Sequence, residues 1–138
     1  MKLALEEAKK SDNDVPIGAL IVYNDEILSV EHNKREELNQ VSAHAEILAL
    51  DKANKKINNW RIENAKMFVT LEPCPMCAWA ILNSRIKELY FGSFDSLYGG
   101  FSVLKLNKLI NSKILIKGGI MEQECSDLIK NYFKGLRK

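Results

Sequence analysis

The segment Pro73-Cys74-Pro75-Met76-Cys77 constrains the fold of this chain more than any other feature. It directly follows the apolar run 66–71, which has the length and composition of a strand. Pro75 is well suited to a first helical position, where no amide hydrogen is needed, and residues 76–83 read as the helix that follows. A strand that passes into a helix within a few residues is typical of α/β folds with parallel neighbouring strands.

Apolar patterns predict the other elements in the same way. Asn24-Asp25 is a plausible turn between two strands that would form an antiparallel hairpin. Ser42 is predicted to be the N-cap of a helix, which would place His44 and Glu46 in its first turn. The first predicted helix spans residues 3–10, and the last spans residues 122–136. The further predicted strands are 19–23, 27–30, 88–91 and 114–116.

Strands that alternate with helices predict an α/β fold, a three-layer α/β/α sandwich with a central mixed sheet of five strands. The 138 residues contain no internal repeat, low-complexity tract or linker, so we expect residues 1–138 to form a single domain.

Composition indicates a cytoplasmic globular protein. Apolar residues make up 46% of the chain and charged residues 28%. No apolar run approaches the ~18 residues of a membrane helix, and the first residues lack the uninterrupted apolar stretch of a signal peptide. Three cysteines, two of them in C-x-x-C, do not form a secreted disulfide framework.

His44, Cys74 and Cys77 form a candidate metal site, with the carboxylate of Glu46 two residues from the histidine. A structural zinc site has four protein ligands, whereas a catalytic site keeps one position open for water. With only two histidines and three cysteines in the chain, a fourth ligand is hard to find. Cys74 and Cys77 lie three residues apart at a helix start, where their sulfurs share one side and thiolates are favoured. The pattern predicts a hydrolytic zinc centre with Glu46 as the base.

Each part of this pattern has a simpler interpretation. An isolated C-x-x-C is also a redox pair or half of a structural zinc site, and a lone histidine on a helix is usually packed or solvated. The combination is more specific, because H-x-E about 30 residues before P-C-x-x-C is the described signature of zinc deaminases acting on cytosine or adenine. A purely structural zinc site would leave Glu46 without a purpose.

Longer blocks carry a resemblance to a known family. They are D-V-P-I-G-A at 14–19, A-H-A-E-I at 43–47, V-T-L-E-P-C-P-M-C-A at 69–78, S-R-I at 84–86 and F-G-S-F-D at 91–95. Through them the chain resembles the bacterial tRNA-specific adenosine deaminases of the cytidine-deaminase-like superfamily, over nearly its whole length. The resemblance implies the cytidine-deaminase-like α/β/α fold. It also implies the conversion of adenosine to inosine at the wobble position of a tRNA anticodon loop.

It also implies roles for single residues. His44, Cys74 and Cys77 would bind one Zn²⁺ per subunit, and Glu46 would shuttle protons. Asn33 would hydrogen-bond the flipped nucleoside, although it also fits a polar strand end.

Further contacts to RNA follow from the same resemblance. Asp95 would lie near the ribose-phosphate of the anticodon loop, where a 2′-hydroxyl contact suits an acid, although a loop cap is the simpler reading. The family forms homodimers with the tRNA loop near the subunit boundary, so we expect a homodimer. Other predicted substrate-binding residues are Pro16, Ala45 and Pro73. Independently of the resemblance, the chain closes on a basic helix face whose residues are predicted to contact RNA phosphates, although a solvated helix end is the simpler interpretation: Lys130, Lys134, Arg137 and Lys138.

Two features depart from the family pattern. Trp79 stands where a small residue is usual, and we interpret it as a core or interface anchor, although it could also reshape the pocket or stack on a base. Residues 97–102 are an imperfect copy of the family's small-residue loop. Both departures bear on substrate choice. A free nucleobase or nucleoside deaminase of the guanine or cytosine type therefore stays an alternative, as does a non-catalytic zinc-stabilised RNA-binding domain.

Overall fold

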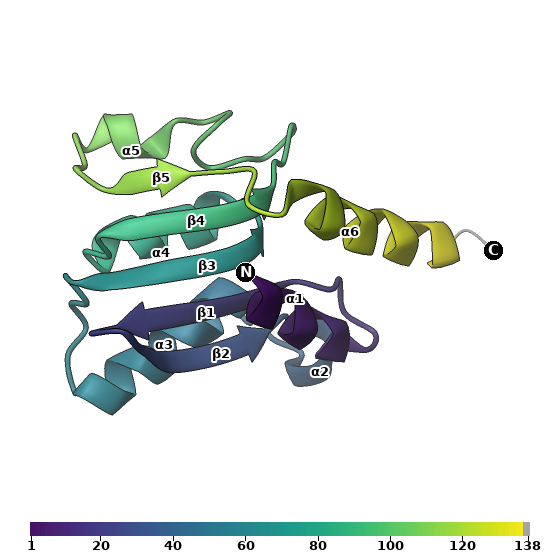
Figure 1. Cartoon of the computed structure of the whole chain (residues 1–138), viewed down its shortest axis with the longest axis horizontal. Coiled ribbons are helices and arrows are strands. Elements are labelled where there is room, and N and C mark those ends of the chain that lie inside the picture. Colours follow the sequence, from purple (N-terminus) through teal and green to yellow (C-terminus); the bar gives the residue numbers. More distant parts are fainter. Residues whose placement is uncertain (137–138) are drawn as a thin grey trace.

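The computed structural model describes residues 1–136 and contains one five-stranded sheet with helices on both faces (Figure 1). The strands are β1 (Gly18–Tyr23), β2 (Glu26–His32), β3 (Ala65–Leu71), β4 (Glu88–Ser93) and β5 (Leu115–Lys117). The helices are α1 (Lys2–Ala8), α2 (Arg35–Leu38), α3 (Ala45–Ile57), α4 (Pro75–Asn83), α5 (Leu106–Leu109) and α6 (Glu122–Leu136), and a 3-10 turn (Lys9–Ser11) extends α1.

The sheet is mixed, in the order β2-β1-β3-β4-β5. β1 pairs antiparallel with both β2 and β3, whereas β3, β4 and β5 run parallel. Asn24 and Asp25 form the hairpin turn in left-handed conformations, which asparagine and aspartate adopt more readily than most residues. The predicted α/β class and mixed five-stranded sheet are confirmed.

One face of the sheet packs on α3 and α4, which lie behind the sheet in Figure 1. Alternate strand residues such as Ile21, Val69 and Phe91 point to this side and form the core with Leu50 of α3 and Ile81 of α4. The alternation has period two, so the intervening residues face the opposite layer.

The opposite face is covered by α1 and by the start of α6. A Cβ on Gly18 would lie 1.9 Å from the carbonyl oxygen of Ala4, and one on Gly92 would lie 2.2 Å from Sγ of Cys125. Glycine at these two positions lets α1 and α6 approach the strands. The remainder of α6 extends beyond the sheet (Figure 1). None of the helices in residues 1–136 has both the length and the apolar character needed to cross a bilayer.

The predicted N-cap at Ser42 is wrong. α3 begins at Ala45, and His44 is its N-cap residue in an extended conformation. The Ser42 hydroxyl instead accepts a hydrogen bond from the Gln40 side chain. His44 therefore precedes the first turn that was expected to contain it, whereas Glu46 lies within that turn. The four-residue helices α2 and α5 were not predicted, because so short a segment shows no helical periodicity.

Candidate metal centre

His44, Cys74 and Cys77 converge where α3 and α4 begin. His44 is the N-cap of α3 and Cys74 the N-cap of α4, with Pro75 at the first helical position as predicted. Nδ1 of His44 lies 3.6 Å from Sγ of Cys74 and 3.4 Å from Sγ of Cys77. All three ligand atoms lie within 4.8 Å of one another. The structure thus brings together the residues that the sequence proposed as metal ligands.

The spacing of these atoms fits a tetrahedral zinc ion. Zn–N bonds of about 2.0 Å and Zn–S bonds of about 2.3 Å at tetrahedral angles give N–S edges of roughly 3.5 Å. Within residues 1–136, no further histidine, cysteine or carboxylate joins these three residues as a fourth ligand. Three ligands on two helix starts are the donor set of a catalytic site rather than a closed structural one.

Hydrogen bonds at the cluster favour a thiolate. A hydrogen bond from Cys77 and a second from His44 lower the pKa of the Cys74 thiol to about 4, although its burial acts in the opposite direction. The hydrogen bond to Cys74 and burial raise the pKa of Cys77. The hydrogen bond with Cys74 also raises the pKa of His44, against the effect of burial. A thiolate at the N-terminus of α4 is further favoured by the helix dipole.

Glu46, two residues after His44, is a buried carboxylate, with 4% of its surface exposed. Its Oε1 is buried and has no hydrogen-bond partner among the described residues. Burial raises the pKa of Glu46 to about 7; a hydrogen bond from its own backbone opposes this shift and the charge of Cys74 adds to it. A carboxyl group with such a pKa can both accept and donate a proton near neutral pH.

Asn33, the predicted nucleoside contact, lies just after β2 and is buried. Its Nδ2 donates to the carbonyl of Val15 at 3.2 Å, and its Oδ1 accepts the backbone N–H of Arg35 at 3.3 Å. The side chain therefore joins the segment before β1 to the start of α2, and one Nδ2 hydrogen remains free of these two bonds.

The other predicted substrate-binding residues are in different environments. Pro16, Ala45 and Pro73 are buried. Asp95 is half-buried, and its Oδ1 accepts the backbone N–H groups of Leu97 and Tyr98, both at 3.0 Å. Asp95 thus caps its own loop, which is the simpler of its two sequence interpretations, and its contact with RNA stays a prediction.

Trp79 is 43% exposed on α4. The core interpretation is therefore wrong for this chain, because the indole is not enclosed by residues of the same molecule. Lys130 and Lys134 are exposed on α6, as a phosphate contact requires. Arg137 and Lys138, predicted to accompany them, lie outside the described residues.

Glu72 is a polar residue of the site that the sequence interpretation missed. It immediately follows β3 and precedes the first ligand segment, with only 1% of its surface exposed. Its carboxylate accepts four hydrogen bonds from the loop after β4. An acid between a buried strand and Pro-Cys could have marked Glu72 as a buried polar residue. Its hydrogen-bond partners lie 23 to 30 residues later, so no local sequence pattern identifies them.

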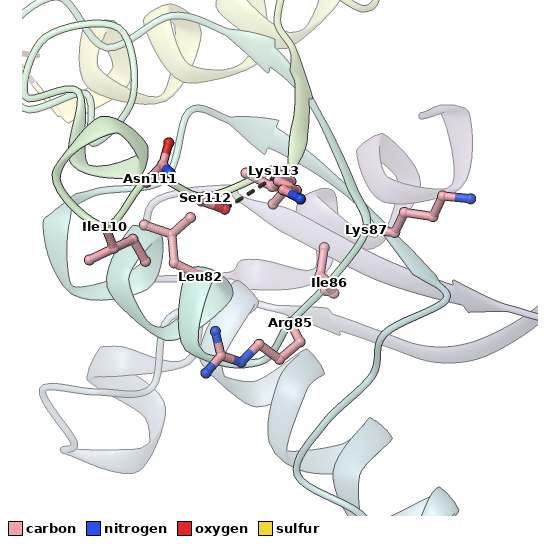
Figure 2. Close-up of a pocket in the computed structure, with 9 residues that line it drawn as sticks. Leu82, Arg85, Ile86, Lys87, Ile110, Asn111, Ser112 and Lys113 are labelled. Carbon is pink, nitrogen blue, oxygen red and sulfur yellow. Dashed lines mark hydrogen bonds between the residues drawn. The ribbon is translucent and has the colours of Figure 1, made fainter.

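A cavity of about 400 Å³ lies at the other end of α4. Figure 2 shows Leu82 and Ile86 there, with the side chains of Arg85 and Lys87 directed away from each other. Because α4 begins at the metal centre and spans roughly 13 Å at 1.5 Å per residue, this cavity is separate from the centre. Its basic groups do not converge on one point.

The sheet and the placement of ligands at two helix N-termini define the class, the cytidine-deaminase-like superfamily. Residues 1–137 match the family model of the MafB19-like deaminases. The tRNA-specific adenosine deaminase of Bacillus subtilis (strain 168) is 44% identical over 100% of this chain and 89% of its own length. The chain belongs to the family of tRNA-specific adenosine deaminases.

A solved structure supports the same assignment, and a second shares the fold. One from a study of A-to-I editing by tRNA:A34 deaminases at the wobble position of transfer RNA has a TM-score of 0.89 and 35% identity, covering 93% of this chain and 96% of that one. A guanine deaminase from Nitrosomonas europaea has a TM-score of 0.84 over 95% of this chain and 81% of its own. Its identity is only 20%, so it shows a shared fold alone.

Proposed function

We propose that this protein hydrolytically deaminates adenosine to inosine at the wobble position of a tRNA anticodon loop. The observation that carries the proposal is the 44% identity with a tRNA-specific adenosine deaminase across the whole chain. The convergence of His44, Cys74 and Cys77 beside a buried carboxylate supports it, because hydrolytic loss of an amine needs an activated water and a proton carrier.

The metal is proposed to be one Zn²⁺ per subunit, held by His44 Nδ1 and the two cysteine sulfurs. When bound, zinc lowers the pKa of a water molecule so that it becomes a nucleophile near neutral pH. The donor set of one imidazole and two thiolates favours zinc over the oxygen-preferring ions Mg²⁺ and Ca²⁺.

Glu46 is proposed to carry the protons. It accepts a proton from the attacking water and gives it to the ring nitrogen of adenine, which prepares C6 for attack. The water oxygen then forms a bond to C6, Glu46 takes the second proton, and the C6–amine bond breaks as that proton reaches the leaving amine. Water and adenosine thus give inosine and ammonia. The buried position of Glu46 two residues from His44 supports this role.

The RNA is proposed to bind with its target base flipped out of the stack, because the reacting atom is otherwise inaccessible. Asn33 would use its remaining Nδ2 hydrogen on the nucleoside, and Asp95 would meet a 2′-hydroxyl. The exposed Lys130 and Lys134, with Arg137 and Lys138, would contact phosphates. Pro16, Ala45 and Pro73 would shape the base pocket from beneath its surface, in agreement with their burial.

We also propose a homodimer, a cytoplasmic location and a single domain over residues 1–138. The exposed apolar surface of α4 around Trp79 and Met76 supports the dimer, since such surface usually contacts a partner. The single sheet that contains all five strands of residues 1–136 supports one domain.

The test supplies zinc-loaded protein with an anticodon stem-loop bearing a wobble adenosine and, separately, with free adenosine, cytidine, cytosine and guanine. We expect inosine and ammonia from the stem-loop and no comparable turnover of the free compounds. Glu46→Gln should abolish turnover while zinc stays bound. Turnover of free guanine without turnover of RNA would replace this proposal with the free-base alternative, and full activity of Glu46→Gln would indicate a non-catalytic domain.

A further inference from the structure

We infer that Glu72 is a positioning residue: it fixes the loop 95–102 beside the metal centre as a rigid platform on which Tyr98 stacks an unpaired base of the RNA. This inference deepens the proposed function and rests on it. It concerns binding of the RNA and assigns Glu72 no part in the chemistry at C6.

The carboxylate of Glu72 joins both ends of this loop. Its Oε1 accepts the backbone N–H of Asp95 at 3.1 Å and the hydroxyl of Ser102 at 2.7 Å. Its Oε2 accepts the backbone N–H groups of Phe101 at 3.2 Å and Ser102 at 2.7 Å. Hydrogen bonds to a buried carboxylate are stronger than those between neutral groups, so the loop is tied to the residue two positions before Cys74.

Two glycines let the loop lie directly on this segment. A Cβ on Gly99 would lie 2.5 Å from Oε1 of Glu72, and one on Gly100 would lie 2.4 Å from Cβ of Ala78. The N–H of Gly100 also donates to the carbonyl of Pro73 at 2.9 Å. The loop therefore contacts both the end of β3 and the helix that carries Cys77, without a space into which it could relax.

Although its backbone is held, the loop exposes large side chains. Leu97 is 72% exposed and Tyr98 65% exposed, directly beyond the Asp95 cap. An exposed aromatic ring on a fixed backbone suits a splayed single-stranded base, because stacking needs a flat surface and little further ordering.

Exposed basic side chains near the loop suit the phosphates of RNA. Lys105 and Lys108 are exposed and, together with Phe94 and Ser102, line a cavity of about 260 Å³. These lysines lie in the segment that directly follows the loop, where they can contact phosphates of an RNA strand whose base stacks on Tyr98.

Glu72→Gln releases one specific bond. The amide oxygen of glutamine can replace Oε2 and keep the N–H groups of Phe101 and Ser102. The amide nitrogen then stands at Oε1, where the Ser102 hydroxyl can rotate to accept a hydrogen bond, but the N–H of Asp95 meets another donor. The start of the loop is therefore freed while its end stays attached.

The experiment measures zinc content, amide hydrogen exchange, and kcat and KM for the anticodon stem-loop in Glu72→Gln, Tyr98→Ala and the control Glu63→Gln. Glu63 is exposed and precedes β3, at the opposite end of the strand from Glu72. In Glu72→Gln we expect unchanged zinc, exchange at Asp95 about tenfold faster, and KM raised about three- to tenfold with kcat changed less than about twofold. Tyr98→Ala should raise KM similarly and leave exchange at Asp95 unchanged, and Glu63→Gln should change none of these quantities.

Several outcomes would overturn the inference. Unchanged KM in Glu72→Gln despite faster exchange at Asp95 would show that the fixed loop does not determine RNA binding. A fall in kcat at constant KM would give Glu72 a different role. If Tyr98→Ala dissociates a dimer and leaves the KM of the remaining species unchanged, the loop serves a second copy. Failure of the wild-type protein to process the stem-loop would reject the proposed function and this inference together. The wild-type measurement alone separates that outcome from failure of the inference about Glu72 and Tyr98.

Discussion

Glu46 and Glu72 are both buried glutamates near the metal centre, yet the same substitution to glutamine should affect them in opposite ways. Glu72 receives four hydrogen bonds, whereas Oε1 of Glu46 has no hydrogen-bond partner among the described residues. A carboxylate that the protein satisfies contributes to stability. One that the protein leaves unsatisfied costs stability and is retained for its chemistry.

The magnitudes follow from these contacts. Glu72→Gln loses at least the bond from Asp95, and a hydrogen bond to a charged group contributes about 1.5–3 kcal/mol. For 138 residues the entropy of unfolding is roughly 0.29 kcal/mol per kelvin, so Tm should fall by about 5–10 °C. Glu46→Gln buries a neutral amide in place of a carboxylate and should leave Tm unchanged or higher. Its kcat should fall at least about 100-fold, which is roughly 2.7 kcal/mol of activation free energy.

The assay compares thermal unfolding of the two variants and the wild type, each loaded with zinc to the same measured content, because bound metal itself raises Tm. Turnover of the stem-loop is measured on the same preparations. A Tm several degrees lower for Glu46→Gln at the same zinc content would refute the reasoning and make Glu46 a structural residue. An unchanged Tm for Glu72→Gln would show that its hydrogen bonds carry little net stability.

Three other outcomes are expected. Gly18→Ala should lower the free energy of unfolding by at least about 1–3 kcal/mol, because its Cβ would meet the backbone of Ala4. Gly135→Ala, in an open part of α6, should raise the free energy of unfolding by up to about 1 kcal/mol. Denaturation midpoints equal to that of the wild type would contradict both expectations. RNA affinity should fall as the salt concentration rises. The double variant Lys130→Ala, Lys134→Ala should make the slope of log affinity against log salt concentration shallower by about 1.4, the value for two contacts to single-stranded RNA. An unchanged slope would remove α6 from the RNA interface. Chelation of zinc should abolish turnover and lower Tm, and readdition of zinc should restore both, whereas activity after complete removal of the metal would reject the metal's role.

Local patterns were sufficient for much of the fold. Apolar runs of strand length identified β3 and β4, and Pro75 identified the start of α4, because these signals lie in consecutive residues. The ligands and Glu46 were also recognisable, since a zinc deaminase needs these residue types at a characteristic spacing. Ser42 was misjudged because serine caps a helix only if its side chain reaches the first free N–H groups, and here it bonds Gln40 instead.

The sequence by itself therefore predicted the order of the strands and longer helices, the cluster of candidate metal ligands and the acid proposed as proton carrier, all of which depend on neighbouring residues or on a known motif. Only the tertiary structure decided that Glu72 holds the loop 95–102, that Gly18 admits α1, and that Trp79 lies on the surface. These contacts join segments far apart along the chain. Their energies depend on which groups meet after folding, and neither periodicity nor composition records that meeting.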